Sequence, residues 1–480
     1  MKKILIIGIV VIFAVLITCA VCLVYVKTLD SKEKKSFENG EASLASQNYE
    51  DAVTAYEKAL AKDPENEEAF LGLVDACLGK KDTKKAEKLL RERIGKTSDK
   101  QKLEAYYDRM FSLYDIMEKT PKEYKALIKE AIEKTQNNEK YEAFNEKIIT
   151  KAPLAIVSLD KGKQGFIKEN GEVFLEVNLP RITPFSKNGL AAAMDFNEKW
   201  GYIDMTGEWV IQPQYVKAGV FGDNGLAPVQ TKRVDYAGAD PYDQKCGYIN
   251  AKGEWVIAPT QLITEYDDWE DAGEFASNGL AKITYYSYDN GYKKGYINAE
   301  GKWVIEGDFI SMGKFNDDGM AYVEKSEEKR LKKGWIDQNG NWLFRTTASY
   351  RNENFSKNQM IAAMDINNGQ YGYQNMQGEW VIPSQFASAT NFGTNFAAAQ
   401  ETIGGGIMKK GDKWGVIDET GNWVLEPQPS SVFIGLGEPG VNDLIPAHKR
   451  DHGWGYINEK GEWVIEPQFN QAEKFISIDD

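Results

Sequence analysis

A pair of glycines separated by five residues recurs eight times between residues 153 and 480, and this repeat constrains the fold more than any other feature of the chain. Successive copies begin 36 to 48 residues apart. Self-similarity at such a period is the signature of a repeat architecture, in which each copy forms one unit and neighbouring units pack on one another. The first glycines are Gly165, Gly201, Gly247, Gly295, Gly334, Gly372, Gly415 and Gly455.

Each copy has the pattern of a β-hairpin. In the second copy, GYIDMTGEWVI, Asp204 and Gly207 suit the first and fourth positions of a type I turn. Glycine also takes the left-handed conformation that a hairpin bulge requires. An Asp or Asn repeats the turn position in the later copies, whereas Lys168 replaces it in the first copy.

A tryptophan follows the turn glycine in seven copies, and we expect it to be structural. If the strands pair without a bulge, Ile203 faces Trp209. Gly201 then faces Ile211, and the indole covers the bare backbone of the glycine. We therefore expect the first glycine, the turn glycine and the tryptophan to be structural in each of these seven copies. These residues are Gly201, Gly207, Trp209, Gly247, Gly253, Trp255, Gly295, Gly301, Trp303, Gly334, Gly340, Trp342, Gly372, Gly378, Trp380, Gly415, Gly421, Trp423, Gly455, Gly461 and Trp463.

Between hairpins lies a second phrase, such as FSKNGLAAA at 185 and FASNGLAKI at 275. Three strands per unit of about 40 residues, eight times, indicate an all-β domain of sheets packed on sheets. Both a closed propeller-like ring and an open β-solenoid satisfy this pattern. We favour the ring because closure removes exposed sheet edges.

Residues 153–480 resemble the WG-repeat (KWG-like) family of bacterial proteins, on the full motif illustrated by WGYIDMTGEWVIQPQY at 200 and WGYINEKGEWVIEPQF at 454. The Trp-Gly pair itself occurs at only three copies, beginning at Trp200, Trp414 and Trp454. The resemblance implies a binding or scaffolding β-domain without defined catalytic residues. Trp454 lies on the face of its strand opposite to that of the glycine, and it retains a candidate role in binding.

Residues 36–150 have helical spacing throughout. Gly40, Ala52, Tyr56, Ala59 and Pro64 fall at the positions where small residues let paired helices approach and a proline closes the unit. The segment from 36 to about 95 therefore resembles tetratricopeptide repeats, which implies an all-α solenoid suited to protein docking or to use as a spacer.

The extreme N-terminus carries an apolar run from 4 to 26 without a charge, preceded by Lys2 and Lys3. This length suits a transmembrane helix. We expect an uncleaved anchor in the cell membrane with the soluble domains outside; a cleavable signal peptide is the alternative. Cys77 and Cys246 are the only cysteines beyond this run, about 170 residues apart, so no structural disulfide is expected.

Charge and composition argue against several classes of function. Residues 153–480 carry 31 Lys and Arg against 46 Asp and Glu, which disfavours nucleic acid and anionic lipid as partners. GLGEPG at 435 matches a dinucleotide fingerprint but lacks the following helix. His448 and His452, the only histidines, run into a strand without a further metal ligand. We therefore expect no cofactor, no metal and no catalytic site.

The variation between copies then predicts the binding site, because extra residues in repeats map to loops on one face. The two longest spacings contain acidic segments rich in aromatic residues, which suit the anchoring of a protein or the stacking of sugars. We expect a non-enzymatic, membrane-anchored surface protein that binds a protein or a cell-wall glycan. A glycoside hydrolase using two carboxylates and a purely structural spacer are the alternatives. The candidate binding residues are Tyr236, Tyr242, Tyr266, Trp269, Tyr285, Tyr286, Tyr288 and Tyr292.

Overall fold

The computed structural model describes residues 35–117, 119–144, 149–150, 152–159, 162–231, 246–262, 272–287, 291–327, 330–350, 355–402 and 410–478. The chain divides into two compact units, Met1–Ile148 and Ile149–Asp480. The apolar run at 4–26 lies outside the described residues. Among the helices that are described, none combines the length and the apolar character needed to cross a membrane.

The first unit is a solenoid of antiparallel helices. Small residues allow the close packing: a Cβ at Gly40 or Gly72 would overlap the ring of Tyr56. Thr120 and Glu123 form a capping box at the helix that begins with Pro121, as the sequence predicts. After a helix at 35–45, the elements are α2 (Tyr49–Leu60), α3 (Glu67–Gly79), α4 (Thr83–Ile94), α5 (Lys100–Ile116), α6 (Pro121–Thr135) and α7 (Asn138–Glu142).

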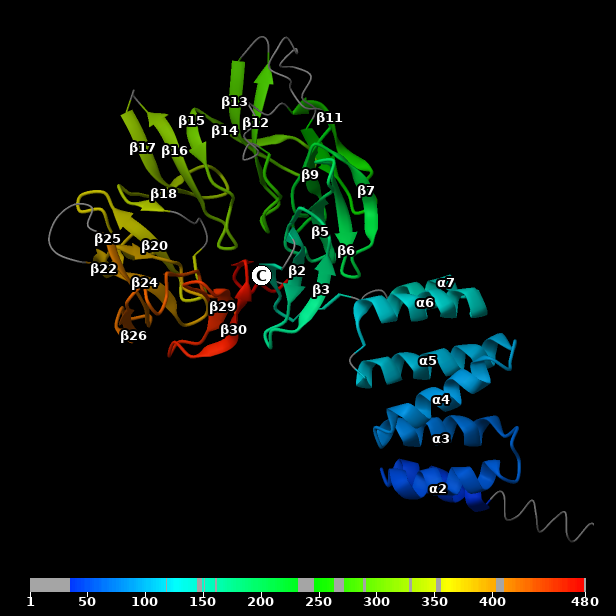
Figure 1. The fold of residues 1–480 in the computed structure, drawn as a ribbon. Coiled ribbons are helices and arrows are strands. Elements are labelled where there is room, and N and C mark those ends of the chain that lie inside the picture. Colours follow the sequence, from blue (N-terminus) through cyan, green and yellow to red (C-terminus); the bar gives the residue numbers. More distant parts are fainter. Residues whose placement is uncertain are drawn as a thin grey trace, which may run out of the picture. The chain divides into compact units, whose positions relative to one another are not determined.

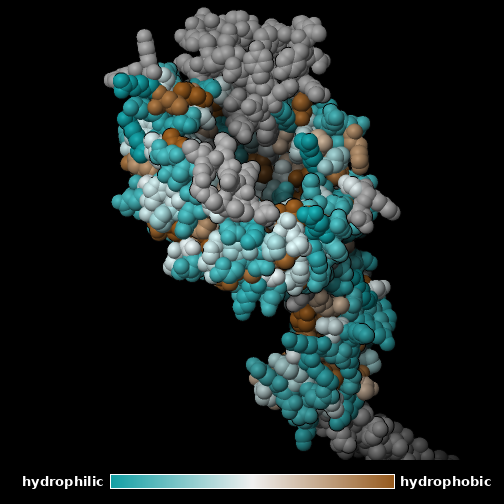
Figure 2. Space-filling view, turned by 60° about the vertical axis from the view of Figure 1, so that its left-hand side comes forward, coloured by the Kyte–Doolittle hydropathy of each residue, from teal (hydrophilic) through white to brown (hydrophobic). Residues whose placement is uncertain are grey.

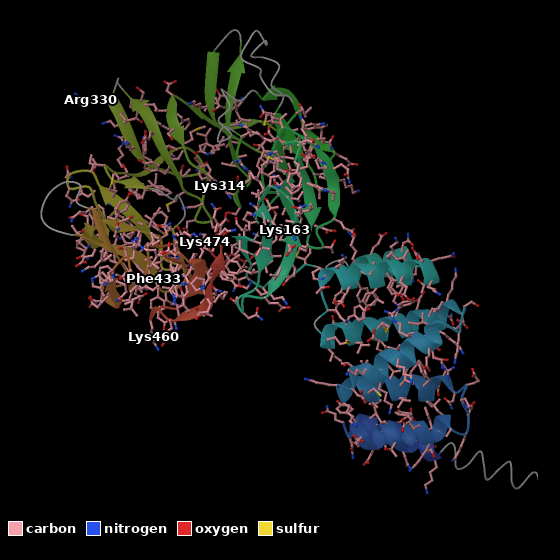
Figure 3. The ribbon with its side chains drawn as sticks, viewed as in Figure 1. Lys163, Lys314, Arg330, Phe433, Lys460 and Lys474 are labelled. Atoms are coloured by element: carbon pink, nitrogen blue, oxygen red, sulfur yellow. The ribbon has the colours of Figure 1, made fainter. Side chains whose placement is uncertain are left out.

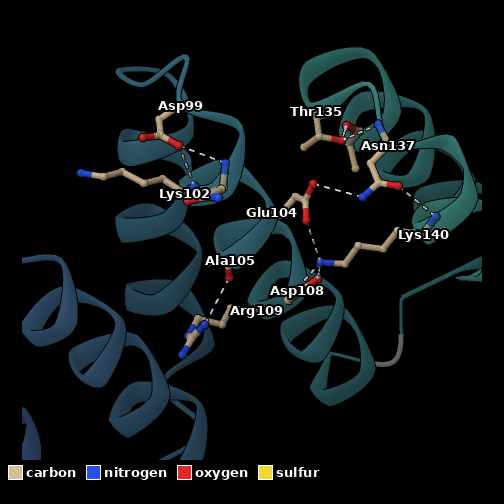
Figure 4. Close-up of polar contacts among 11 residues, drawn as sticks. Asp99, Lys102, Glu104, Ala105, Asp108, Arg109, Thr135, Asn137 and Lys140 are labelled. Atoms are coloured by element: carbon tan, nitrogen blue, oxygen red, sulfur yellow. Dashed lines mark hydrogen bonds and ion pairs between the residues drawn. The ribbon is translucent and has the colours of Figure 1, made fainter.

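Ion pairs join helices that are two apart in the order of the solenoid, such as α5 and α7. The Lys140 ammonium on α7 lies 2.8 Å from a carboxylate oxygen of Asp108 and 3.5 Å from one of Glu104, both on α5 (Figure 4). The Asn137 amide donates a further hydrogen bond to Glu104. Because these charged groups satisfy one another, they hold the helices together rather than offer free charge to a partner.

The second unit consists of eight antiparallel sheets, called blades 1 to 8 in ring order (Figure 1). Blade 1 contains β31 (Gln471–Ala472), β1 (Ala155–Ser158), β2 (Gln164–Ile167) and β3 (Val173–Val177), and blade 2 contains β4 (Arg181–Ile182), β5 (Leu190–Met194), β6 (Trp200–Asp204) and β7 (Trp209–Tyr215). Blade 3 contains β8 (Lys217–Ala218), β9 (Ala227–Gln230), β10 (Cys246–Ile249) and β11 (Trp255–Leu262), and blade 4 contains β12 (Ala281–Ser287), β13 (Gly291–Ile297) and β14 (Trp303–Gly307).

Blades 5 to 8 follow the same order. Blade 5 contains β15 (Phe309–Met312), β16 (Ala321–Glu327), β17 (Arg330–Ile336) and β18 (Trp342–Arg345), and blade 6 contains β19 (Ser349–Tyr350), β20 (Met360–Asp365), β21 (Gln370–Asn375) and β22 (Trp380–Phe386). Blade 7 contains β23 (Ser388–Ala389), β24 (Ala397–Thr402), β25 (Lys410–Ile417) and β26 (Trp423–Gln428), and blade 8 contains β27 (Gly435–Leu436), β28 (Ile445–Lys449), β29 (Gly453–Ile457) and β30 (Trp463–Phe469).

The ring is closed, which makes this unit an eight-bladed propeller. The C-terminal strand β31 pairs with β1 through Val157 and Ala472, so the first blade is completed by the end of the chain. The turn glycine of each blade also packs on the preceding blade, and Gly171 of blade 1 lies against Ile465 of blade 8. The preference for a ring is confirmed. The expected three strands per unit are wrong for most blades, since short strands such as β8 add a fourth.

The hairpin turns form as predicted, but the strand pairing behind them differs. Gly207 has φ +82°, and its N–H donates to the Asp204 carbonyl at 2.9 Å. Ile203 pairs with Trp209, whereas Tyr202 rather than Gly201 pairs with Ile211.

The difference arises because Val210 forms a β-bulge that shifts the register by one residue. A Cβ at Gly201 would overlap the Ile211 carbonyl oxygen, so backbone approach alone already requires a glycine there. The indole of Trp342 lies next to Gly334, and that of Trp423 lies next to Gly415, as the sequence analysis expected for these pairs.

In five of the eight blades the residue after the first glycine is a completely buried tyrosine, which the sequence analysis did not single out. Tyr373 is completely buried, and its hydroxyl donates to the Thr390 carbonyl of the next blade at 2.8 Å. Its ring centroid lies 4.7 Å from that of Phe392. Equivalent hydroxyl bonds between blades are donated by Tyr202, Tyr248, Tyr296 and Tyr456. The hairpin tryptophans are less buried; Trp255 is 40% exposed.

Candidate functional site

The meander of each blade brings its longest connections to one face of the ring, here called the insertion face. Gln230, Cys246 and Leu262 lie side by side in blade 3, at the ends of β9, β10 and β11. Segments 231–245 and 263–271 therefore both begin at this end of the strands. The connection between Ser287 and Gly291 in blade 4 lies at the same face, because β12 and β13 correspond to β9 and β10 and successive strands alternate in direction.

The predicted binding residues occur in these segments. Tyr236, Tyr242, Tyr266, Trp269 and Tyr288 lie outside the described residues. The other three belong by their backbone to the extended hairpin of blade 4: Tyr285 and Tyr286 continue β12, and Tyr292 on β13 pairs with Tyr286. Their side chains lie outside the described part of the structure, so a shared aromatic surface stays a prediction.

The two histidines have different neighbours. The His448 ring stacks on Trp454 with centroids 4.9 Å apart and an interplanar angle of 6°. The His452 Nδ1 lies 2.7 Å from the Arg450 carbonyl oxygen in the adjoining turn. Within the described ranges, no three His, Cys, Asp or Glu side chains are grouped to hold a metal. Trp454 lies on the sheet face opposite to Trp463, as expected, and packs against the core shared with blade 1.

A cleft of about 620 Å³ lies between blades 5 and 6, and the sequence analysis missed it. Trp380 and Gln374 of blade 6 line one side, and Leu331 of blade 5 lies across from them. Ile366, at the tip of hairpin β20–β21, closes the end at the insertion face. Its volume suits a side chain or a small molecule of several rings.

The junction between blades 5 and 6 lacks a ring contact that two other junctions have. The sixth residue after the hairpin tryptophan of blade 2 is Tyr215, which packs edge-on against Trp255 of the next blade at 6.3 Å. Phe386 meets Trp423 in the same way. The corresponding residue of blade 5 is Ala348. Trp380 has no ring against it among the described residues and is 36% exposed, whereas Trp255, which contacts Tyr215, is 40% exposed.

The side chains around the cleft combine apolar and basic character. Leu331 is 50% exposed and Ile366 is 56% exposed. Lys332 is half-buried and makes no ion pair within the described residues, and Arg330 is exposed at the tip of hairpin β16–β17 (Figure 3). Arg345 is held 2.9 Å from Glu327. The rim of this cleft is thus basic, although the propeller as a whole is acidic.

Other polar groups near the cleft are already engaged. The Tyr350 hydroxyl donates to the Gln374 carbonyl oxygen at 2.6 Å, and burial raises the pKa of Tyr350. On the other side of blade 5, the Lys325 ammonium lies 4.6 Å from the centroid of Phe309 and 5.5 Å from that of Trp342. Burial lowers the pKa of Lys325.

Away from this cleft, the surface offers no broad apolar face on the side seen in Figure 2, where apolar patches are scattered among hydrophilic residues. The sequence carried no signal for the cleft, because its lining residues come from two blades and lie far apart in the chain, as Leu331 and Trp380 do.

Two family models match the chain. WG containing repeats match residues 165–200, 200–232, 247–260, 295–328, 371–401, 414–428 and 454–477. A tetratricopeptide repeat matches residues 43–101. A search of curated protein sequences found no match.

Several solved structures are similar to the chain at low identity. Apo AztD from Citrobacter koseri is 11% identical, with 68% of this chain and 97% of that one covered and a TM-score of 0.36. Acylaminoacyl peptidase from Pyrococcus horikoshii is 8% identical, with coverage of 56% and 49% and a TM-score of 0.36. Prolyl oligopeptidase B from Galerina marginata is 11% identical, with coverage of 68% and 52% and a TM-score of 0.37. At these scores the likenesses say nothing about activity.

Proposed function

The propeller belongs to the family of WG containing repeats and the helical unit carries a tetratricopeptide repeat, and on this premise we propose a non-enzymatic, membrane-anchored binding protein. The apolar run at 4–26 anchors the chain as a single-pass helix, and the soluble domains face outward. The propeller binds a protein or a cell-wall glycan at its insertion face.

One observation supports this proposal: the two longest insertions begin at the same end of the strands of blade 3, beside Gln230, Cys246 and Leu262. Both are rich in aromatic and acidic residues. Binding residues are often placed on loops that a rigid scaffold presents together. The closed ring is such a scaffold, since each blade is packed between two others.

Protease accessibility on intact cells tests the location. We expect externally added protease to cleave the propeller of a chain tagged at its C-terminus, while a cytoplasmic control protein in the same cells stays intact. Protection of the tag until the cells are lysed would refute the outward orientation, and with it an extracellular partner.

Loop replacement tests the binding face. Replacing 232–245 by the short turn that joins β5 to β6 removes Tyr236 and Tyr242. We expect this variant to lose retention on cell-surface proteins or on purified cell-wall glycan, with unchanged thermal unfolding. The matched control shortens 403–409 between β24 and β25, a segment at the same face without aromatic residues. Equal retention by the wild type and both variants would contradict the proposal.

A further inference from the structure

Two turns at the insertion face present a bulky apolar side chain to solvent. Phe196, between β5 and β6 of blade 2, is 68% exposed, and Ile366, between β20 and β21 of blade 6, is 56% exposed. These are the largest exposed fractions among the large apolar side chains of the described residues. Single exposed apolar side chains are ordinary, so the argument depends on how these two positions are related.

The two turns share their sequence and their first hydrogen bonds. Residues 192–197 read Ala-Ala-Met-Asp-Phe-Asn, and residues 362–367 read Ala-Ala-Met-Asp-Ile-Asn. The carboxylates of Asp195 and Asp365 each accept the N–H of the asparagine two residues later at 2.9 Å. The turn of blade 6 is one residue longer, but this difference comes after the shared part. The same kind of Asx turn therefore presents both apolar side chains.

The two turns lie at opposite ends of one diameter of the ring. Blades 2 and 6 are four blades apart in a ring of eight, and β5 and β20 lie on opposite sides of that ring (Figure 1). Each turn joins the second strand of its blade to the third, so both turns project from the insertion face. A half-turn about the ring axis therefore brings one apolar tip approximately onto the other. A partner that makes the same contact at both tips has a two-fold axis of its own, which is the commonest symmetry of protein oligomers.

The residue types at the tips favour a pocket in a protein over a sugar or a lipid surface. A sugar stacks on an aromatic face, which Phe196 offers and Ile366 does not, so the tips share only apolar bulk. Membrane-surface anchors carry Lys or Arg beside their apolar residues, but the turn at 365–370 contains neither. Although burial acts to raise it, hydrogen bonds from neighbouring N–H groups lower the pKa of Asp195 overall. A basic side chain beside an apolar pocket would complement this carboxylate.

We infer that Phe196 and Ile366 are two equivalent anchors for one homodimeric partner protein. Each subunit of that partner receives one tip in an apolar pocket, and a basic side chain beside the pocket pairs with the adjacent Asp195 or Asp365. The inference rests on the proposed function as a binding protein. It narrows the partner to a protein with two-fold symmetry and places these contacts outside the long insertions of blade 3.

Photo-crosslinking in the cells that produce the protein tests the inference. The crosslinker p-benzoylphenylalanine replaces Phe196 in one variant of the full chain and Ile366 in another, and the cells are irradiated before purification through a C-terminal tag. We expect both variants to crosslink to the same peptide of the same protein, and we expect that protein to be a homodimer by light scattering. The matched controls carry the crosslinker at Val210 or Val381, which are about half exposed on the outer strands of the same two blades. Neither control should label that peptide.

The purified partner then gives the size of each contact. Phe196→Ser and Ile366→Ser should each raise its Kd for the full chain in detergent micelles by about tenfold or more. The reason is that the loss of one tip turns a two-point contact into a one-point contact. Val210→Ser and Val381→Ser should leave the Kd within about twofold. All four side chains are strongly exposed, so each variant should fold.

Four results would overturn the inference. They are no crosslink from either tip, crosslinks to different proteins or to different peptides of one protein, a monomeric partner, and an unchanged Kd in both serine variants of the tips. A crosslink to phospholipid or to a second copy of this chain would overturn it too, and would assign the tips to the membrane or to self-association. Failure here leaves the result of replacing 232–245 standing, and protease protection on intact cells leaves a shared partner peptide valid.

Discussion

Replacing Tyr373 by phenylalanine isolates the hydrogen bond that joins blade 6 to blade 7. The hydroxyl is buried and donates to the Thr390 carbonyl at 2.8 Å. The ring itself stays in place, because it packs against Phe392 and Phe386 through its carbon atoms. The substitution removes one oxygen atom and leaves no space that neighbouring side chains must fill.

The expected cost follows from the buried acceptor. Removing the donor leaves the Thr390 carbonyl without this partner, and a buried group deprived of its hydrogen bond costs about 1–3 kcal/mol in the free energy of unfolding. Tyr373→Ala would also lose the ring contacts and create a cavity, for a total cost of about 3–5 kcal/mol. The difference between the two variants separates the hydroxyl from the ring.

Urea unfolding followed by tryptophan fluorescence measures both variants. Tyr215→Phe is the matched control, because the Tyr215 ring is buried while its hydroxyl donates to no described residue. Its cost should stay within about 0.5 kcal/mol. If Tyr373→Phe is no more destabilising than Tyr215→Phe, the hydroxyl does not join the blades energetically and the reasoning fails.

Three further predictions concern the hairpin and the thiols. Gly455→Ala should destabilise the propeller by about 1–3 kcal/mol in urea unfolding, because its Cβ would overlap the Ile465 carbonyl oxygen. The hydrogen bond from Thr420, with backbone N–H donors, lowers the pKa of Asp418, so its stabilisation is present above the unfolded-state pKa and is lost on acidification. Asp418→Asn should therefore lose less thermal stability than the wild type between about pH 6 and pH 3. Burial raises the pKa of Cys246 to about 12, so iodoacetamide should label it only after unfolding, as peptide mapping will detect.

Each of these three predictions can be refuted by a specific result. Gly435→Ala is the control for the glycine, since a Cβ there meets nothing within 4 Å, and equal effects would exclude the backbone clash. Identical pH profiles of Asp418→Asn and wild type would remove this turn from the acid response. Labelling of Cys246 in the native protein would show that its surroundings open readily.

The repeat could be predicted from the sequence in its local detail. The turn at Asp204 and Gly207 formed as expected, because a four-residue turn depends on neighbours in the chain. The pairing of Gly201 with Ile211 was wrong, since the bulge at Val210 depends on how the strand meets the next blade. The tyrosines that join blades at five junctions were overlooked for the same reason: the partner of Tyr373, Thr390, lies 17 residues further along the chain.

The hairpin tryptophans are less buried than the tyrosines that follow the first glycine. Trp463 packs edge-on against Phe433 but remains half-buried, whereas Tyr456 is completely buried. The cleft at Trp380 also escaped prediction. Its lining residues come from two blades and lie far apart in the chain, as Leu331 and Trp380 do.

The sequence alone determined the number of units, the turns, the helical solenoid and the excess of acidic residues, because each depends on composition or on residues close together in the chain. Only the tertiary structure decided that the eight units close into a ring and that β31 completes blade 1. It also decided which side chains face each other across blades. Those contacts join residues far apart in the chain, and their geometry depends on the twist and bulges of whole sheets, which no single repeat encodes.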